Sequence, residues 1–540
     1  MSKKEKNFVI QATILSVSTI ICRIIGMLYR SPLKNVITAL GNGYYSTAYG
    51  IYLIILLISS YNIPLAISKL VAEQNSLGKH KNAQRIFRCS LVYVFIIGGI
   101  ASILTYACAP LLVYDNPNAT MALRVLAPTI FFSGILGAFR GYFQADGDMV
   151  KTSVSQIIEQ IANAVISILA ALILTNGIEK GSELLAKRGA AGGAFGTLAG
   201  VLTGILYMII AFLLSKKRTN KNICEDNSTP DSYKSIFKLI LIIVTPIIFT
   251  AFICNISTTV NMLVYYRIMK IKGIAENLYS TYYGVFSGEF VVLINVPIGI
   301  AASIANAIVP RISASYANRD LEQTTKKTNE AISLSMLIGV PAAAGLCSLA
   351  YPIIGSLFWQ AETIDMSARF LIYGSAVAAF TSFSTVVISV LQAIGKVNKP
   401  VKNAIITIVI DLVILFLLLW FTDLGIYALL ITMIVQSLIL CITNFISLKK
   451  CIGYKLQTKE TIVYPFIASA IMGVISYCVY KLTYILIPSY IICLIIAGCV
   501  GIAVYFITII KIGGVKKEAL LSLPKGEIIA KLATKLKLLK

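Results

Sequence analysis

The chain is a succession of long apolar runs that are separated by short polar breaks, many of which contain glycine or proline. Most runs reach the length of about 20 apolar residues that an α-helix needs to cross roughly 30 Å of hydrocarbon. The pattern therefore predicts an all-α integral membrane protein with about fourteen transmembrane helices. We place these helices at residues 8–29, 44–66, 87–113, 121–143, 154–175, 189–214, 237–266, 278–309, 330–350, 366–391, 402–421, 424–447, 461–480 and 484–510.

Positive charge is distributed unevenly over the segments that connect these runs. With the N-terminus in the cytoplasm, 35 of the 47 Lys and Arg residues fall in cytoplasmic segments and 9 in outer loops. Arg140 is counted here with Lys151, in one of the cytoplasmic segments. Because cytoplasmic loops of membrane proteins are enriched in Lys and Arg, we expect a multi-pass protein of the cytoplasmic membrane with both termini inside.

Composition agrees with this interpretation. Only 13% of the residues are charged and 57% are hydrophobic, whereas soluble domains contain about 25% charged residues. The net charge of +24 is explained by basic cytoplasmic loops, so we expect no nucleic-acid partner. Eleven cysteines are present without a C-x-x-C pair, which indicates neither a disulfide framework nor a metal site. Residues 526–540 form a basic amphipathic pattern that predicts a helix lying on anionic membrane lipids.

A hexapeptide motif occurs twice in similar form. Residues 45–50 read YSTAYG and residues 279–284 read YSTYYG, and each is followed at nearly the same distance by an Asn-x-Pro motif, at Asn62 and Asn295. Two copies of six spans enter the membrane from the same side, which predicts two parallel, pseudo-symmetric six-helix bundles with substrate between them. Two further helices follow the second bundle.

This repeat predicts five parts of the chain. They are an N-terminal bundle at 1–214, a cytoplasmic linker at 215–236, a second bundle at 237–448, two extra transmembrane helices at 449–511 and a basic cytoplasmic tail at 512–540. The linker is polar and charged, and we expect it to be long enough for the two bundles to move.

Several motifs resemble those of one transporter superfamily. Residues 18–30 read STIICRIIGMLYR, residues 62–64 read NIP, residues 295–297 read NVP, residues 309–313 read VPRIS and residues 391–396 read LQAIGK. In these motifs and in its six-plus-six-plus-two spans, the chain resembles the multidrug/oligosaccharidyl-lipid/polysaccharide (MOP) exporter superfamily. The resemblance is to its polysaccharide branch, which includes stage V sporulation protein B and the MurJ-type lipid II flippases.

The resemblance implies a flippase that moves an undecaprenyl-pyrophosphate-linked sugar, either lipid II or another polysaccharide precursor, across the cytoplasmic membrane by alternating access. The implied partners are this lipid-linked sugar and the membrane lipids, with the cell-wall synthesis machinery left open. It also implies that arginines of the first span face a central cavity. Arg23 fits that pattern through the R-x-x-G frame with Gly26, and Arg30 is carried over as a second cavity residue one position out of step.

Arg23 is also a candidate from physical chemistry alone. An ionisable group inside a span costs about 2.5–3.5 kcal/mol on insertion scales, so it faces a cavity or a partner. At 1.5 Å per residue, Arg23 lies roughly 22 Å into the first span. A guanidinium offers the paired donors that a pyrophosphate accepts. We predict a pyrophosphate clamp, with outward snorkelling or internal pairing of Arg23 as the alternative.

The same argument selects three acidic residues inside spans. Glu159, Asp411 and Glu289 are candidates for coupling to H⁺ or Na⁺, or for ion pairing with a basic residue. Glu289 is in addition a candidate cavity residue, as are Asn62 and Asn295, which precede helix-kinking prolines. The membrane potential is a third candidate energy source for transport.

Seven tyrosines gather at the outer ends of the second and eighth spans. We interpret them as an aromatic belt at the membrane surface, with sugar stacking as the alternative. They are Tyr44, Tyr45, Tyr49, Tyr52, Tyr279, Tyr282 and Tyr283.

Features of an enzyme are lacking in the sequence. The single histidine, His80, lies in a cytoplasmic loop, and no D-x-D, H-E-x-x-H or Walker motif occurs. We therefore predict that the protein is not an enzyme and uses no cofactor and no metal. The alternatives left open are a multidrug cation antiporter of the same superfamily, a membrane glycosyltransferase or ligase, and a scaffold.

Overall fold

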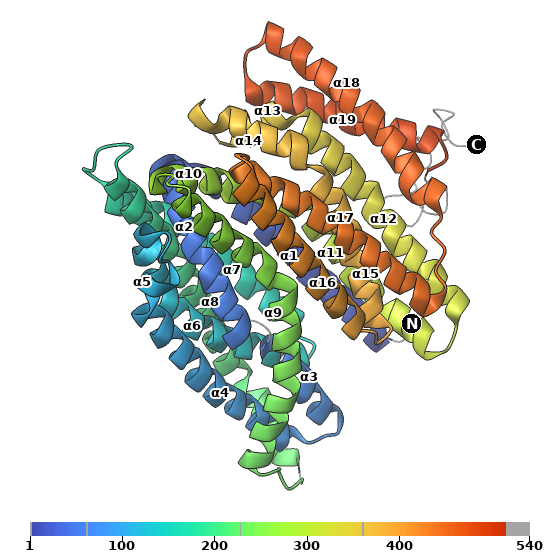
Figure 1. The fold of residues 1–540 in the computed structure, drawn as a ribbon. Helices are drawn as coiled ribbons and strands as arrows, with labels where there is room; N and C mark the ends of the chain where they lie inside the picture. The colour runs from blue at the N-terminus through green and yellow to red at the C-terminus, as the bar shows by residue number, and fades with distance from the viewer. Residues whose placement is uncertain (1–2, 61–62, 227, 359–360, 515–540) are drawn as a thin grey trace. The chain divides into compact units, whose positions relative to one another are not determined.

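The computed structural model of the protein describes residues 3–60, 63–226, 228–358 and 361–514 (Figure 1). These residues form helices and no β-strand, which confirms the predicted all-α fold class. Residues 526–540, with their predicted surface helix, lie outside the described part. The helices are α1 (Lys3–Leu28), α2 (Arg30–Ser59), α3 (Ile63–Ser76), α4 (His80–Ala107), α5 (Ala109–Leu112), η1 (Pro117–Ala119), α6 (Thr120–Ala145), α7 (Met149–Thr175), α8 (Glu183–Glu225), α9 (Tyr233–Ile271), α10 (Glu276–Val285), η2 (Phe286–Phe290), α11 (Val291–Ala317), α12 (Leu321–Ser348), α13 (Ala350–Leu357), α14 (Ala361–Gly374), α15 (Ala376–Ala393), α16 (Asn398–Phe421), α17 (Ile426–Ile452), η3 (Lys459–Val463), α18 (Tyr464–Leu486) and α19 (Tyr490–Lys511).

Twelve helical segments among the described residues are long and apolar enough to cross a membrane. They correspond to the predicted spans other than the first and the seventh. The first predicted span is α1, of which only Val17–Leu28 forms a shorter apolar helix, and the seventh is α9. The total of fourteen spans stays a prediction.

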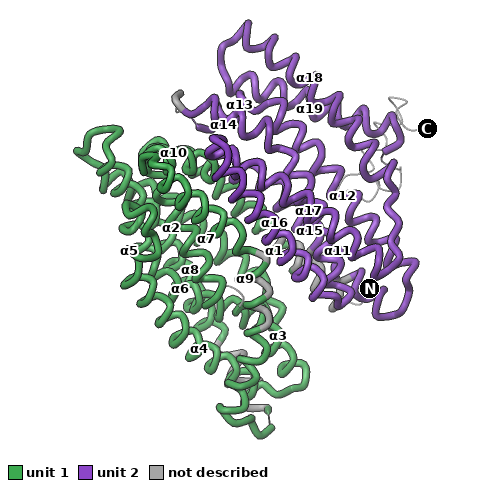
Figure 2. The backbone as a smooth tube through the Cα atoms, in the orientation of Figure 1, with its two compact units in different colours: residues 1–288 green, residues 289–540 purple. Residues whose placement is uncertain are grey.

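The chain divides into two compact units, Met1–Gly288 and Glu289–Lys540 (Figure 2). This division lies between α10 and α11, inside the predicted eighth span, and not in the predicted linker at 215–236. The reason is that α9 packs against α2 and α4 of the first unit, and α10 packs against α2. Helix α8 continues to Glu225, so only residues 226–232 separate α8 from α9. The bundle boundaries that the repeat predicts remain predictions.

Glycines on α8 bring that helix close to α7. Gly196 and Gly200 are one turn apart and face α7 on the same side of α8. A Cβ atom at Gly196 would lie 2.5 Å from the backbone nitrogen of Ser167, and one at Gly200 would lie 2.6 Å from the carbonyl oxygen of Glu159. Small residues permit this close backbone approach between membrane helices. The position of Glu159 is therefore fixed by direct backbone packing.

Aromatic packing fixes the adjacent end of α6. The ring of Phe87 on α4 lies 5.4 Å from the ring of Phe139 and 4.6 Å from that of Tyr142, both on α6. Phe212 of α8 completes the cluster at 5.6 Å from Phe87. Arg140 lies between two of these ring-bearing positions along α6, so its backbone is held by apolar packing on either side.

The two copies of the repeated hexapeptide lie on helices that cross closely. The Asn42 side-chain amide of α2 donates a 2.6 Å hydrogen bond to the carbonyl oxygen of Gly284 on α10. A Cβ atom at Gly284 would lie 2.6 Å from the backbone nitrogen of Gly43. The hydroxyls of Thr47 and Tyr266 lie 2.7 Å apart beside this crossing. The two backbones are so close that positions 43 and 284 require glycine.

The short segment between α8 and α9 is bound to the start of α4. The backbone N–H of Lys81 donates to Asp226 at 2.7 Å, and the Asn82 side-chain amide donates to Asp231 at 2.6 Å. Arg85 donates to the carbonyl oxygen of Asp231 at 2.8 Å. These contacts attach the segment at 226–232 to the first unit. The backbone N–H of Lys81, followed by Ser228, lowers the pKa of Asp226 to about 2.

Candidate functional site

Helix α1 has three distinct sides. An exposed apolar stripe consists of Val17, Ile21, Ile24 and Leu28, each 39–51% exposed. A second side packs on α7, where the Ser18 hydroxyl donates to Gln156 at 3.4 Å. A Cβ atom at Gly26 would lie 3.1 Å from the Gln160 amide nitrogen, which extends this contact by two turns. The apolar stripe is the side suited to lipid.

Arg23 lies on the third side of α1. At 100° per residue, it is about 130° around the helix from the centre of the apolar stripe and about 100° from the side that packs on α7. The Arg23 side chain is exposed, although it does not belong to the exposed apolar stripe. An exposed guanidinium on a side of the helix that is not its apolar stripe is the arrangement expected for a hydrated surface inside the membrane.

Arg30 begins α2, directly after α1 ends, and is half-buried. Its electrostatic neighbours are the hydroxyl groups of Tyr29, Tyr45 and Tyr49. Two of these rings, Tyr45 and Tyr49, stack with their centroids 5.7 Å apart. The structure thus places Arg30 among tyrosines.

The interpretation of the tyrosines as a surface belt is wrong for most of them. Tyr44, Tyr45, Tyr52, Tyr279 and Tyr283 are all buried, with 0–6% of their surface exposed. Their hydroxyls contact polar groups of the bundle: that of Tyr279 donates to the Asp115 carbonyl oxygen at 2.6 Å, and that of Tyr44 accepts from Asn118 at 3.3 Å. A hydroxyl that finds a partner inside the protein allows a tyrosine to pack in the core, and the sequence pattern does not distinguish this from a belt.

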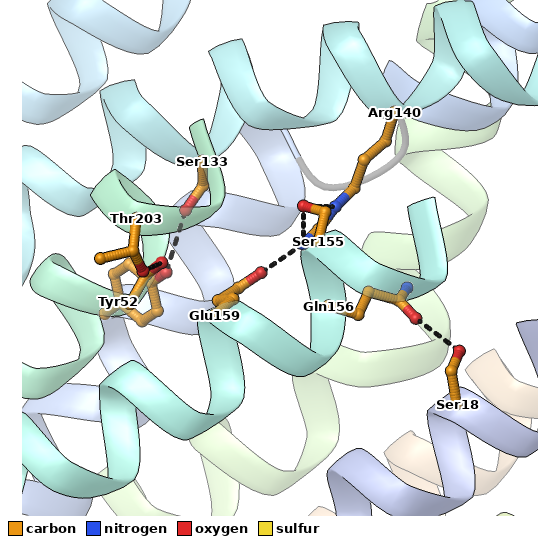
Figure 3. A network of polar contacts seen from close by, with 9 residues as sticks. Ser18, Tyr52, Ser133, Arg140, Ser155, Gln156, Glu159 and Thr203 are labelled. Carbon is orange, nitrogen blue, oxygen red and sulfur yellow. Dashed lines mark hydrogen bonds and ion pairs between the residues drawn. The ribbon is translucent and has the colours of Figure 1, made fainter. Parts of the chain in front are cut away.

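An ion pair inside the first unit joins α6 to α7 (Figure 3). The Nη2 atom of Arg140 lies 2.6 Å from Oε2 of Glu159, and 15% and 28% of the two side chains are exposed. Arg140 also donates to the Ser155 hydroxyl, from Nη2 at 2.9 Å and from Nε at 3.3 Å. Figure 3 shows these three side chains converging from the two helices. Glu159, a candidate for either coupling or ion pairing, is thus ion-paired with Arg140 in this structure.

Further polar contacts surround this pair. On one side is the Ser18–Gln156 hydrogen bond from α1 to α7, and on the other the Tyr52 hydroxyl lies 3.5 Å from the Ser133 hydroxyl of α6 (Figure 3). Together these residues form a polar network that draws on α1, α2, α6 and α7. The network lies between helices whose other sides are apolar, so it is a candidate site and not a random surface feature.

Arg140 is the residue that sequence reasoning missed. The charge distribution assigns it to the cytoplasmic segments, although it lies inside the predicted fourth span and five residues before the end of α6 at Ala145. The available signal was its place between Phe139 and Tyr142, in an otherwise apolar run. A charged residue in such a run deserves the same functional hypothesis as Arg23.

The remaining candidates lie mainly in the second unit. Glu289 is completely buried, in the π-helical turn η2 that joins α10 to α11. Asp411 is also buried, on α16, while Asn295 of α11 is exposed. Asn62 lies outside the described residues. The site assignments of these residues, like those of Arg23 and Arg30, stay predictions.

A polar seam accompanies Asp411. The Asn403 side-chain amide of α16 donates to Asn444 of α17 at 2.8 Å, and the Asn444 amide donates to Ser384 of α15 at 3.0 Å. Asp411 lies two turns further along α16 than Asn403. In the described part of the chain, no group of three or more His, Cys, Asp or Glu side chains is arranged to hold a metal ion.

The sequence of the chain is related to known protein families. Residues 9–316 match the sequence family described as "Polysaccharide biosynthesis protein", and residues 290–417 match the MatE family. The chain is 25% identical to the lipid II flippase MurJ of Bacillus subtilis over 481 residues, which cover 85% of this chain and 86% of MurJ. It is 23% identical to stage V sporulation protein B of the same organism over 489 residues, covering 88% and 91% of the two chains.

A solved structure shares the fold. The structure of a lipid II flippase MurJ in an inward closed conformation superposes with a TM-score of 0.64 at 16% identity, covering 92% of this chain and 97% of that chain. At this identity the likeness concerns the fold alone. All of these relatives and neighbours are members of the superfamily that the sequence motifs indicated.

Proposed function

Because the chain belongs to the polysaccharide biosynthesis protein family of the MOP superfamily, we propose that it is a flippase for an undecaprenyl-pyrophosphate-linked sugar. It moves this lipid across the cytoplasmic membrane by alternating access. The observation that carries the proposal is the exposure of Arg23 on a side of α1 that is separate from the exposed apolar stripe of that helix. The names of two relatives, lipid II flippase MurJ and stage V sporulation protein B, support cargo of this class.

The chemistry of Arg23 suits the polar end of such a lipid. A guanidinium is always charged and presents paired N–H donors that match the oxygens of a phosphate group. A diphosphate in a membrane needs a cation to compensate its charge, while its polyprenyl tail remains in the hydrocarbon. The exposed Arg23 and the exposed apolar stripe, on separate sides of α1, offer both environments on one helix. Arg30, Asn62, Glu289 and Asn295 are the further residues that we propose for the cavity.

Transport needs an energy source, and the acidic residues inside spans are the candidates. Glu159, Asp411 and Glu289 are proposed sites for coupling to H⁺ or Na⁺, with the membrane potential as the alternative. Both termini are proposed to lie in the cytoplasm, on the charge distribution of the loops.

Transport in vesicles tests the proposal. Purified protein is reconstituted with a fluorescently labelled lipid-linked disaccharide diphosphate, and the fraction of label on each leaflet is measured with a membrane-impermeant quencher. We expect the wild type to equilibrate the label and Arg23→Ala to abolish this while expressing normally. An altered precursor indicates an enzyme, and a precursor that stays in place indicates a drug antiporter or a scaffold. Normal transport by Arg23→Ala removes the clamp.

Rescue of growth distinguishes the cargo. We expect the chain to support a Bacillus subtilis strain that is depleted of its lipid II flippases, if lipid II itself is transported. Transport in vesicles without rescue indicates another polysaccharide precursor that carries the same diphosphate and polyprenyl groups.

A further inference from the structure

We propose that Arg140 is a second guanidinium of the diphosphate site, and that Glu159 is a built-in anion which the diphosphate displaces from it. This inference rests on the proposed function, and it adds to that function a residue on α6 and an exchange of anions. Four features of the first unit support it.

The pair lies at the same level of the bundle as Arg23. Ser18 contacts Gln156, and Gly26 faces Gln160, so α1 and α7 run in the same direction here and residues 18–26 lie alongside 156–160. Cys22, the neighbour of Arg23, is within electrostatic range of both Glu159 and Arg140. An anion that reaches Arg23 therefore arrives at the level of the pair.

The pair is accessible on a side that is not suited to lipid. Helix α7 has an exposed apolar stripe of its own, which consists of Ile161, Val165, Leu169, Leu172 and Ile173. At 100° per residue, Glu159 is about 110° around the helix from the centre of this stripe. Its side chain is still 28% exposed. Like Arg23, Glu159 thus reaches the surface of the unit away from the apolar stripe of its helix.

Arg140 retains hydrogen-bonding capacity for another anion. Its contacts with Glu159 and Ser155 use Nη2 and Nε. Among the described residues, Nη1 makes no hydrogen bond. A guanidinium has five N–H donors and binds best to two oxygens side by side. The single contact with Glu159 leaves that preference unmet, and a diphosphate offers more oxygens and more charge than one carboxylate.

Glu159 has a clear role when no substrate is present. A lone guanidinium inside the membrane is strongly unfavourable, and the carboxylate compensates it in the empty state. When the diphosphate takes over this compensation, Glu159 is released next to Ser155, one turn earlier on α7. The Ser155 hydroxyl, which accepts from Arg140 in this structure, can then donate to the released carboxylate. The site is compensated in both states.

Binding of a short prenyl diphosphate tests the exchange. The full chain in detergent is titrated with farnesyl diphosphate and with farnesyl monophosphate, and the two affinities are compared for each variant. We expect Glu159→Gln to bind the diphosphate about tenfold more tightly, because a competing anion of modest strength is gone. We expect Arg140→Gln to bind it about tenfold more weakly and to lose preference for the diphosphate over the monophosphate.

A matched control uses the other ion pair on α7. Lys151 contacts Asp148 at 3.0 Å near the start of the helix. Lys151→Gln removes one positive charge from the same unit and should leave both affinities unchanged. If the loss of one positive charge were enough to weaken binding, Lys151→Gln would weaken it as well.

Four results test the proposal. Unchanged or weaker diphosphate binding by Glu159→Gln overturns the exchange. Unchanged binding by Arg140→Gln, with binding lost in Arg23→Ala, overturns the role of Arg140 while the proposed function stands. A wild-type chain that binds no prenyl diphosphate contradicts the proposed function itself. If Glu159→Gln does not fold, the double variant Arg140→Gln/Glu159→Gln restores neutrality, and a preference of that variant for the diphosphate over the monophosphate equal to that of the wild type overturns the role of Arg140.

Discussion

Replacing Glu159 with glutamine removes the negative charge that lies 2.6 Å from Arg140 inside the first unit. At an effective dielectric constant of about 20, two charges about 4 Å apart attract each other by roughly 4 kcal/mol. Part of this is offset by the desolvation of both groups, so the net effect is smaller. An ionisable group inside a span costs about 2.5–3.5 kcal/mol on insertion scales. Since 28% of the Glu159 side chain is exposed, we expect Glu159→Gln to destabilise the protein by about 2.5 kcal/mol, the lower end of this range.

Replacing Arg140 with glutamine should destabilise the protein less than replacing Glu159. A carboxylate that has lost its cation can take up a proton and become neutral, whereas a guanidinium stays charged. We therefore expect Arg140→Gln to destabilise the protein by only about 1.5 kcal/mol, the range of a lost hydrogen bond to a charged group. In the double variant neither charge is left alone, and we expect about 1.5 kcal/mol in total, which gives an interaction energy near 2.5 kcal/mol in the cycle.

Unfolding by SDS in mixed micelles, followed by circular dichroism, measures these four free energies of unfolding. The decisive feature is that the double variant is more stable than Glu159→Gln alone. Effects that simply add, within about 0.5 kcal/mol, would show that the two side chains do not interact energetically. The contact between them would then have no consequence for stability, and the reasoning about a compensated guanidinium would be refuted.

Three further predictions concern packing and docking. Gly196→Leu should destabilise α7 against α8 by about 3 kcal/mol or more, because its Cβ would contact Ser167; the yield of monodisperse protein in size-exclusion chromatography checks this, with Gly498→Leu, which has open space around it, as the control. Gly284→Val should force α10 away from Gly43, so a cysteine pair bridging α2 and α10 should cross-link less in this variant, and undiminished cross-linking contradicts the close crossing. Asp226→Ala should release the 226–232 segment from Lys81, giving faster tryptic cleavage there. Because the folded pKa of Asp226 is lowered to about 2, its contribution is fully present above the ordinary value near 4 and is lost as pH falls towards 2. The ratio of the cleavage rates of Asp226→Ala and the wild type should therefore be the same at pH 8 and at pH 6.

The sequence was sufficient for the fold class because apolar runs of membrane length leave few alternatives to a helix. It also selected Glu159 as a candidate, since an acid in an apolar run is conspicuous. Its partner was missed because Arg140 stands only five residues before the end of α6, where an arginine can equally belong to a basic loop. Helix ends are the least certain part of any such prediction.

The tyrosines show a second kind of failure. An aromatic residue near a helix end is compatible with the membrane surface and with the protein core, and the choice depends on which partners the fold brings close. Tyr279 is buried because the Asp115 carbonyl oxygen accepts its hydroxyl, and the sequence separation of these two residues conceals that contact. The same holds for α9 and α10, which pack on α2 of the first unit although the repeat pairs them with later helices.

The accessibility of position 23 tests the central claim most directly. In a variant without its eleven native cysteines, single cysteines are placed at Arg23, on the third side of α1, and at Ile24, on its apolar stripe. Membrane vesicles are then treated with a charged, membrane-impermeant thiol reagent. The account predicts rapid modification at position 23, slowed by added farnesyl diphosphate, and little modification at position 24. Equal reactivity at the two positions, or reaction at position 24 alone, would contradict a hydrated, cationic surface on α1.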